Sequence, residues 1–299
     1  MTLSNKTLKP RLACEITPES VIAARASAEA PGIALYTARK LAPNVIAPSL
    51  SANNVVDAVA LRDALSGALA SVAARGRDVI AILPDAAVHV LLLDFESLPE
   101  KPAEATPLIR FRIRKSLPFD VDKAALSYQS RRVNGTIKVM AAVTATEVLA
   151  GYETAFREAG YDPGVVLPST LAALSTIEAY TPTLLVKIEG PYITMAIMNQ
   201  DDVLLYRTLD APNSRPLSGA EIAEAVYPSI VFFEDTYGAR IQRIFLAGPT
   251  QLMETRAALE AQTGVRAEEL TTDLAVGESL SGEATPNSAL AGIAGVLAH

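Results

Sequence analysis

The sequence predicts a mixed α/β protein with an internal duplication, and three observations carry this prediction. Residues 11–45 contain three apolar runs joined by turn residues, which is the pattern of a three-stranded antiparallel meander. Residues 183–210 repeat the same order of strand, turn, strand, turn and strand. Between the meanders, residues 81–165 add a strand, a charged segment and a hairpin. We therefore predict two related halves, with a small subdomain inserted in the first.

The elements of the first half follow from local patterns. The strands of its meander are expected at residues 12–16, 21–27 and 32–41. Thr17 and Pro18 lie in the first turn, where glycine is the usual residue if the backbone must approach a phosphate group. Residues 57–76 carry apolar side chains at near-helical spacing and end on a glycine, so we predict a helix there.

The inserted segment contains two pairs of predicted strands. Residues 78–99 indicate a buried strand, a turn at Pro84-Asp85 and a second strand. Two further runs, at 124–133 and 136–144, flank Asn134-Gly135, which is a preferred two-residue hairpin turn.

The charged segment between these strands is ambiguous. Residues 100–107 are polar and contain proline, as in a link. In residues 109–119, large apolar side chains alternate with arginine, which is the strand pattern, yet Ile109, Ile113 and Leu117 also form one stripe of a helix. The pattern alone leaves both structures open.

The remaining elements complete the second half. Helices are expected at residues 146–160, 169–180, 218–238 and 286–298, and a strand at 243–248. We divide the chain into residues 1–80, the first half of the duplicated fold, residues 81–165, the insert, and residues 166–299, the second half with its linking and C-terminal helices.

Composition excludes several classes of function. The chain has 299 residues, of which 50% are hydrophobic and 20% charged, and its net charge of −7 argues against a surface for nucleic acid. A single cysteine and two histidines argue against disulfides, histidine triads and Cys/His metal sites. We find no apolar run of signal-peptide or membrane-spanning length, so we expect a soluble, cytoplasmic protein.

One stretch carries a family resemblance. Residues 81–129 contain a Pro-Asp turn, a strand ending on Leu-Pro, a charged segment, a Pro-Phe exit and a Tyr-Gln strand. With the two meanders and the apolar tail at 286–298, the chain resembles PilM-like type IV pilus assembly proteins of the actin-like ATPase superfamily, and more distantly FtsA and the type II secretion L protein. The resemblance implies a duplicated actin-like (ribonuclease H-like) fold with an inserted strand-helix-strand-strand subdomain.

The resemblance also decides the ambiguous segment in favour of a helix. Its apolar side chains, Leu108, Ile109, Ile113 and Leu117, would then be buried. The basic side chains, Arg110, Arg112, Arg114 and Lys115, would surround the rest of the helix. A solvated helix face is favoured for these charges, and contact with a partner or acidic lipid is the alternative.

PilM-like proteins hold ATP with three loops, and each loop has matching residues in this chain. The first loop of the family is an Asp-Ile-Gly turn, and this chain has Glu15, Ile16 and Thr17, followed by Pro18. The carboxylate is kept, but Thr17 places a side chain where bare backbone is needed and Pro18 has no N–H to donate.

The other two loops also differ from the pattern of the family. In the second, Lys187 stands in the position of the family's acidic residue, and Glu189-Gly190 follow. Lys187 could bind phosphate or form an ion pair with Glu15, and the pair is favoured because the first loop has lost its glycine. In the third, Gly248 remains of a Gly-Gly pair and Pro249 replaces the second glycine. We therefore expect no cofactor, no metal and no catalytic residue, with Mg-ATP binding as the alternative.

By resemblance, the expected function is that of a non-catalytic scaffold under the inner membrane. It would bind the N-terminal peptide of a PilN-like inner-membrane protein, and a pilus assembly ATPase is a further candidate partner. Nucleic acid is not expected as a partner. The protein would be associated with the membrane only through its partners. The predicted groove is walled by one set of residues from the turn and strand, Pro84, Val88 and Val90, and one from the helix, Ile109, Arg110 and Arg114. The alternatives are an active actin-like ATPase and, more weakly, a sugar or acetate kinase, which needs an aspartate base.

Overall fold

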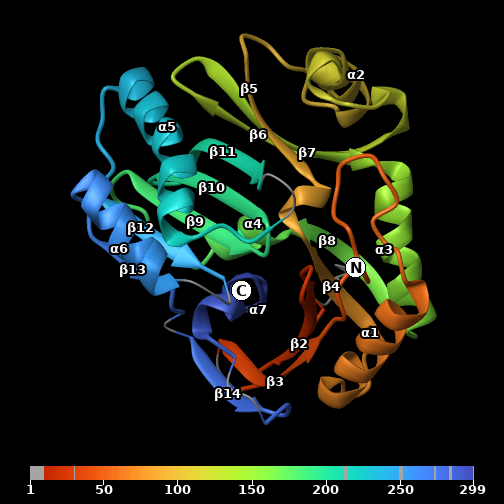
Figure 1. The fold of residues 1–299 in the computed structure, drawn as a ribbon. Coiled ribbons are helices and arrows are strands. Elements are labelled where there is room, and N and C mark those ends of the chain that lie inside the picture. The colour runs from red at the N-terminus through yellow and green to blue at the C-terminus, as the bar shows by residue number, and fades with distance from the viewer. Residues whose placement is uncertain are drawn as a thin grey trace.

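The computed structural model describes residues 10–29, 31–211, 215–248, 252–272, 274–282 and 285–298, and within them the strands form three sheets (Figure 1). The first sheet has six strands in the spatial order β14 (Ala275–Ser279), β3 (Gly32–Lys40), β2 (Ser20–Ala26), β1 (Leu12–Ile16), β4 (Asp78–Leu83) and β8 (Asp162–Pro168). Strands β1, β2 and β3 form the predicted antiparallel meander, and β4 pairs parallel to β1.

Alternation along β1 places its side chains on two different faces of this sheet. Leu12, Cys14 and Ile16 share a core with helices α1 (Ala58–Val72) and α3 (Thr146–Glu158). Ala13 packs on the opposite face against α7 (Ala291–Leu297). Because side chains alternate along a strand, Glu15 lies on the same face as Ala13, toward the centre of the molecule.

The second sheet repeats the plan of the first. Its spatial order is β11 (Asp202–Asp210), β10 (Tyr192–Asn199), β9 (Thr183–Glu189), β12 (Arg243–Ala247) and β13 (Ala267–Glu269). An antiparallel meander is again followed by a strand parallel to its first member, so the predicted duplication is confirmed. Helices α5 (Gly219–Tyr237) and α6 (Leu252–Thr263) share a core with this sheet.

Helix α5 is capped at both ends, at the bounds expected from the sequence. Ser218 and Glu221 form a reciprocal capping box at its start. Gly238 ends it with φ of 63°, a left-handed conformation that glycine adopts without a steric penalty.

The third sheet belongs to the insert and has the order β5 (His89–Phe95), β7 (Thr136–Ala145) and β6 (Ala124–Val133). Helix α2 (Pro102–Ile113) packs on it, so the helix implied by the resemblance is confirmed. Asn134 and Gly135 form the predicted hairpin turn, both with positive φ.

Two predictions about α2 are wrong. The polar link at 100–107 is largely helical, because Pro102 occupies the first turn, where a missing N–H removes no helical hydrogen bond. Leu108 was expected in the core but is 46% exposed, whereas Ile109 and Ile113 are fully buried. The helix is turned so that the i, i+4 pair Ile109 and Ile113 points inward, which leaves Leu108 outside.

Other differences concern element ends and short strands. The helix expected at 57–76 ends at Val72, and the one expected at 169–180 is α4 (Ser169–Leu174). Among the strands and α-helices of the described residues, β8, α6, β13 and β14 were not predicted. Burial of β8 beside β4 and the parallel pairing of β14 with β3 are tertiary contacts that the local patterns do not encode.

Helices α4 and α7 cross at the centre of the molecule, between the two large sheets (Figure 1). A Cβ at Gly295 would collide with the carbonyl oxygen of Ala172, so the two helices touch backbone to backbone. None of the helices in the described ranges is both long enough and apolar enough to span a membrane. The division into 1–80, 81–165 and 166–299 stays a prediction.

Candidate functional site

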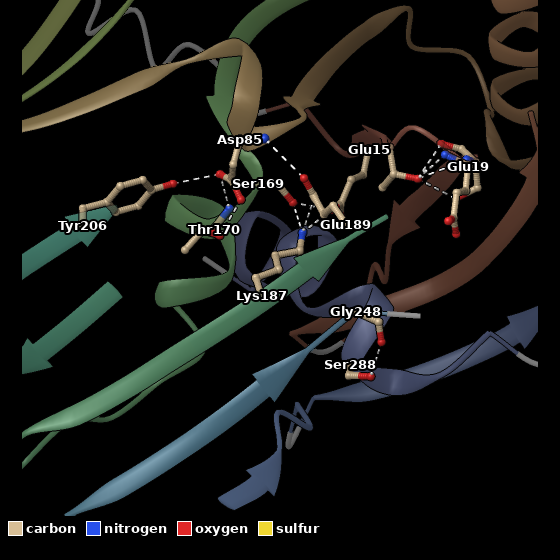
Figure 2. Close-up of polar contacts among 12 residues, drawn as sticks. Glu15, Glu19, Asp85, Ser169, Thr170, Lys187, Glu189, Tyr206, Gly248 and Ser288 are labelled. Carbon is tan, nitrogen blue, oxygen red and sulfur yellow. Dashed lines mark hydrogen bonds and ion pairs between the residues drawn. The ribbon is translucent and has the colours of Figure 1, made fainter. Parts of the chain in front are cut away.

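The candidate site lies between the two large sheets, where β1 and β9 end. The Lys187 ammonium on β9 is 2.6 Å from Glu15 Oε1 on β1 and 3.0 Å from Glu189 Oε1 (Figure 2). The three side chains are at most 4% exposed. The ion pair between Lys187 and Glu15 predicted from the sequence is therefore confirmed, and Glu189 is a second carboxylate on the same lysine.

The first residue of α4 completes this cluster. The Ser169 hydroxyl donates to Glu15 Oε1 and accepts from the Lys187 ammonium. The sequence did not indicate Ser169, because a serine in the first turn of a helix carries no local sign of partners on β1 and β9. We call Glu15, Ser169, Lys187 and Glu189 the buried charge cluster.

The cluster holds two carboxylates and one ammonium, and the pKa values of Glu189 and Lys187 are both shifted upward. Burial raises the pKa of Glu189 to about 7, against the lowering effect of Lys187. Burial lowers the pKa of Lys187, but the nearby carboxylates, Glu15 first among them, more than offset this, so its net shift is upward. Lys187 is thus held in its charged form inside the protein.

Asp85 connects the buried charge cluster to the rest of the molecule. It lies in a short 3₁₀ helix (Asp85–Ala87), and its backbone N–H donates to Glu189 Oε2 at 3.3 Å. Its carboxylate accepts from the Thr170 N–H at 2.9 Å, from the Thr170 hydroxyl and from the Tyr206 hydroxyl at 2.8 Å (Figure 2). From the sequence pattern, Asp85 was expected only in a turn, and Thr170 and Tyr206 were not expected to belong to a site.

A cavity of about 410 Å³ opens beside the cluster. Its lining includes all six residues predicted from the three loops: Glu15, Thr17, Lys187, Glu189, Gly190 and Gly248. The tertiary structure thus brings the three loops together, as the resemblance implies. Pro249, the replaced glycine of the third loop, lies outside the described residues.

Several solved structures are similar in fold to this chain. The PilM-PilN type IV pilus biogenesis complex matches with a TM-score of 0.77 and 19% identity, covering 97% of this chain and 98% of that chain. The chain has the actin-like ATPase fold. Two further matches are the cytoplasmic domain of EpsL, an inner-membrane component of the type II secretion system of Vibrio cholerae, and the ethanolamine utilization protein EutJ from Carboxydothermus hydrogenoformans.

These two matches have lower similarity. EpsL has a TM-score of 0.53 and 11% identity, covering 95% of this chain and 92% of that one. EutJ has a TM-score of 0.52 and 10% identity, with coverage of 98% and 91%. No family model and no curated protein sequence matches the chain.

The β1–β2 turn corresponds to the first loop of the resemblance. Its backbone N–H groups form hydrogen bonds within the turn itself. The Thr17 N–H donates to the Ser20 carbonyl at 2.8 Å. The Thr17 hydroxyl accepts from the N–H groups of Ser20 at 3.0 Å and Glu19 at 3.4 Å. Pro18 has no N–H, so this turn presents no uncommitted backbone donor to a phosphate group.

Gly190 and Gly248 are the glycines that the second and third loops keep, and the local backbone requires a glycine at each position. Gly190 has φ of 59° in the turn between β9 and β10. At Gly248, φ is 132° and a Cβ would collide with the Ile188 carbonyl oxygen. The Gly248 carbonyl also accepts from the Ser288 hydroxyl at 3.1 Å, which ties the third loop to the segment before α7 (Figure 2).

The residues predicted as walls of a peptide groove do not come together. Val88 and Val90 line a second cavity, of about 600 Å³, with Leu50 and Leu209. Pro84 precedes the 3₁₀ helix that enters this cavity.

The predicted helix wall lies elsewhere. Ile109 is fully buried among Leu91, Leu93 and other core residues of the insert. The Arg110 guanidinium donates to the Val121 carbonyl and, at 2.9 Å, to the Ala124 carbonyl. Arg114 is exposed beyond the end of α2. The cavity that contains Val88 and Val90 is lined by the loop containing Leu50 and by strand β11, and none of the predicted α2 residues lines it.

Proposed function

We propose that the protein is a non-catalytic scaffold of a type IV pilus or related secretion assembly, located in the cytoplasm beside the inner membrane. The proposal rests on the residues at the position where an actin-like fold would hold a nucleotide. The Lys187 ammonium pairs there with the carboxylates of Glu15 and Glu189. In the β1–β2 turn, the backbone N–H groups are bonded within the turn, which leaves none for a phosphate group. Likeness to the PilM-PilN complex over nearly the whole chain supports the choice of assembly.

The cavity of about 600 Å³ is proposed to take the N-terminal peptide of a PilN-like inner-membrane protein. Its apolar wall residues Val88, Val90 and Leu209 suit the side chains of an extended peptide, and Tyr206 and Arg207 provide polar groups at the same cavity. A pilus assembly ATPase is a further proposed partner, and the membrane would be reached through the PilN-like protein.

Millimolar Mg-ATP is expected to leave the melting temperature unchanged. A ligand present at 100 times its dissociation constant would stabilise the fold by about 2.7 kcal/mol, which shifts the melting temperature by several degrees. Thermal unfolding with ATP alone, Mg²⁺ alone and both together measures this. A stabilisation that needs both components would contradict the proposal and support the alternative, an active ATPase with a diverged pocket.

Peptide binding is expected to depend on the cavity and not on α2. Leu50→Asp places a charge at the half-buried edge of the cavity and should weaken a PilN-like N-terminal peptide at least about tenfold. Arg114→Glu is the matched control and should leave the affinity unchanged. Fluorescence anisotropy of a labelled peptide gives both values, and the opposite ranking would assign the groove to α2.

A further inference from the structure

The side chain of Tyr206 lies between the cavity of about 600 Å³ and the centre of the molecule. It extends from β11, is half-buried and lines the cavity. Its ring packs against a core that contains Ala173 and Leu185. Its hydroxyl donates to Asp85 Oδ1 at 2.8 Å (Figure 2). A hydroxyl that donates one hydrogen bond can still accept another, so Tyr206 keeps an acceptor for a molecule bound in the cavity.

Asp85 is held more firmly than Tyr206. It is 1% exposed, and its backbone N–H donates to Glu189 Oε2 at 3.3 Å. Its carboxylate accepts from both the N–H and the hydroxyl of Thr170, a fully buried residue in the first turn of α4. Buried partners on β9 and α4 therefore fix Asp85, and Asp85 in turn fixes the direction of the Tyr206 hydroxyl.

The hydrogen bond between Asp85 and Tyr206 joins the two walls of the cavity. Asp85 precedes Val88 and Val90 on one wall, and Tyr206 precedes Leu209 on the other. Burial, and after it the charge of Asp85, raise the pKa of Tyr206 well above its ordinary value, so the hydroxyl keeps its proton at neutral pH. A bond from a hydroxyl to a carboxylate is also stronger than one between neutral groups.

We propose that Asp85 is a positioning residue for the peptide cavity, because it fixes where the Tyr206 ring and its remaining acceptor meet the bound peptide. This inference rests on the proposed function, in which the cavity takes the N-terminal peptide of a PilN-like protein. Tyr206 touches the peptide, and Asp85 acts through Tyr206. Loss of the Asp85 carboxylate thus weakens binding although no atom that touches the peptide is removed.

A double-mutant cycle on the affinity of the labelled PilN-like N-terminal peptide tests this relation. Tyr206→Phe should weaken binding about fivefold, as expected for one hydrogen bond, and Asp85→Ala should weaken it by a similar factor. The double variant should bind no more weakly than either single variant, because both changes break the same connection. Asp85→Asn should keep most of the affinity, since its amide oxygen can still accept from Tyr206.

Tyr180→Phe is the matched control for the loss of a tyrosine hydroxyl. The Tyr180 hydroxyl also donates to a carboxylate, that of Glu178, but the side chain is 78% exposed and does not line the cavity. Its affinity should equal that of the wild type. Additive losses in the double variant would overturn the inference. Tyr206→Phe decides the matter even where Asp85→Ala does not fold, since a wild-type affinity in this variant would also overturn it.

The position of the Tyr206 ring tests the inference without the peptide. Crystal structures of the unliganded wild type and of Asp85→Asn should show the ring in one place, and that of Asp85→Ala should show it displaced. A ring that stays in place in Asp85→Ala would overturn the inference. A wild type that binds no PilN-like peptide would contradict the proposed function instead, and the ring position would still decide the role of Asp85.

Discussion

Lys187→Met is expected to destabilise the fold by about 3–5 kcal/mol, because it leaves buried carboxylates without their cation. Glu15 and Glu189 both contact the Lys187 ammonium, and each is at most 3% exposed. Methionine has a similar length and no charge, so packing changes little and the electrostatic effect dominates. Equilibrium unfolding in urea measures the loss, as a lower midpoint at unchanged slope.

Two further variants show where this energy comes from. Lys123→Met removes an exposed ammonium and should change stability by less than about 0.5 kcal/mol. Glu15→Gln combined with Lys187→Met should be less destabilised than the sum of the single changes, with a coupling of at least about 1 kcal/mol. Additive losses would mean that the ion pair contributes nothing beyond the packing of its side chains.

Glu189→Gln is expected to become more stable relative to the wild type as the pH rises from about 5 to about 8. The folded-state pKa of Glu189 is about 7, above the ordinary value of 4.5, and burial is the main cause. The folded protein therefore binds this proton more tightly than the unfolded chain. Its stabilising effect is complete below the unfolded pKa and is lost as the pH passes through the folded pKa.

The size of this effect follows from the shift. A rise of the pKa from 4.5 to about 7 corresponds to a few kcal/mol at most, and glutamine cannot lose this stabilising effect because its side chain stays neutral. Urea unfolding of both proteins at pH 5, 6.5 and 8 gives the difference at each pH. Glu224→Gln, at an exposed position, controls for the loss of one carboxylate. A difference between Glu189→Gln and wild type that does not change with pH would show that Glu189 is ionised throughout.

The two predictions concern the same residues for one physical reason. Lys187 pairs with both Glu15 and Glu189 inside the protein, beside the cavity that the three loops line. Lys187 supplies the positive charge, Glu15 and Glu189 the negative charge, and Ser169 the neutral hydrogen bonds. The buried charge cluster and Asp85 also tie together β1, β9, α4 and β11, so its loss should affect both halves of the fold.

Local signals in the sequence determined most of the secondary structure. Apolar runs joined by turn residues predicted both meanders, Asn134-Gly135 predicted the hairpin of the insert, and the helix expected at residues 218–238 agrees with α5 and its caps Ser218 and Gly238. Each of these signals acts over a few residues, so it can be seen without the fold. Resemblance was needed for α2, because its alternating residues fit both a strand and a helix.

The sequence by itself also indicated which residues of the three loops depart from the pattern of the family it resembles, and it indicated the pair of Glu15 with Lys187. Only the tertiary structure decided that Glu189 and Ser169 join this pair and that Asp85 links it to Thr170 and Tyr206. It also decided which face of α2 is buried and which residues line the cavity beside Val88 and Val90. These contacts join residues that lie far apart in the sequence, and their positions depend on how the sheets and central helices pack, which no local pattern encodes.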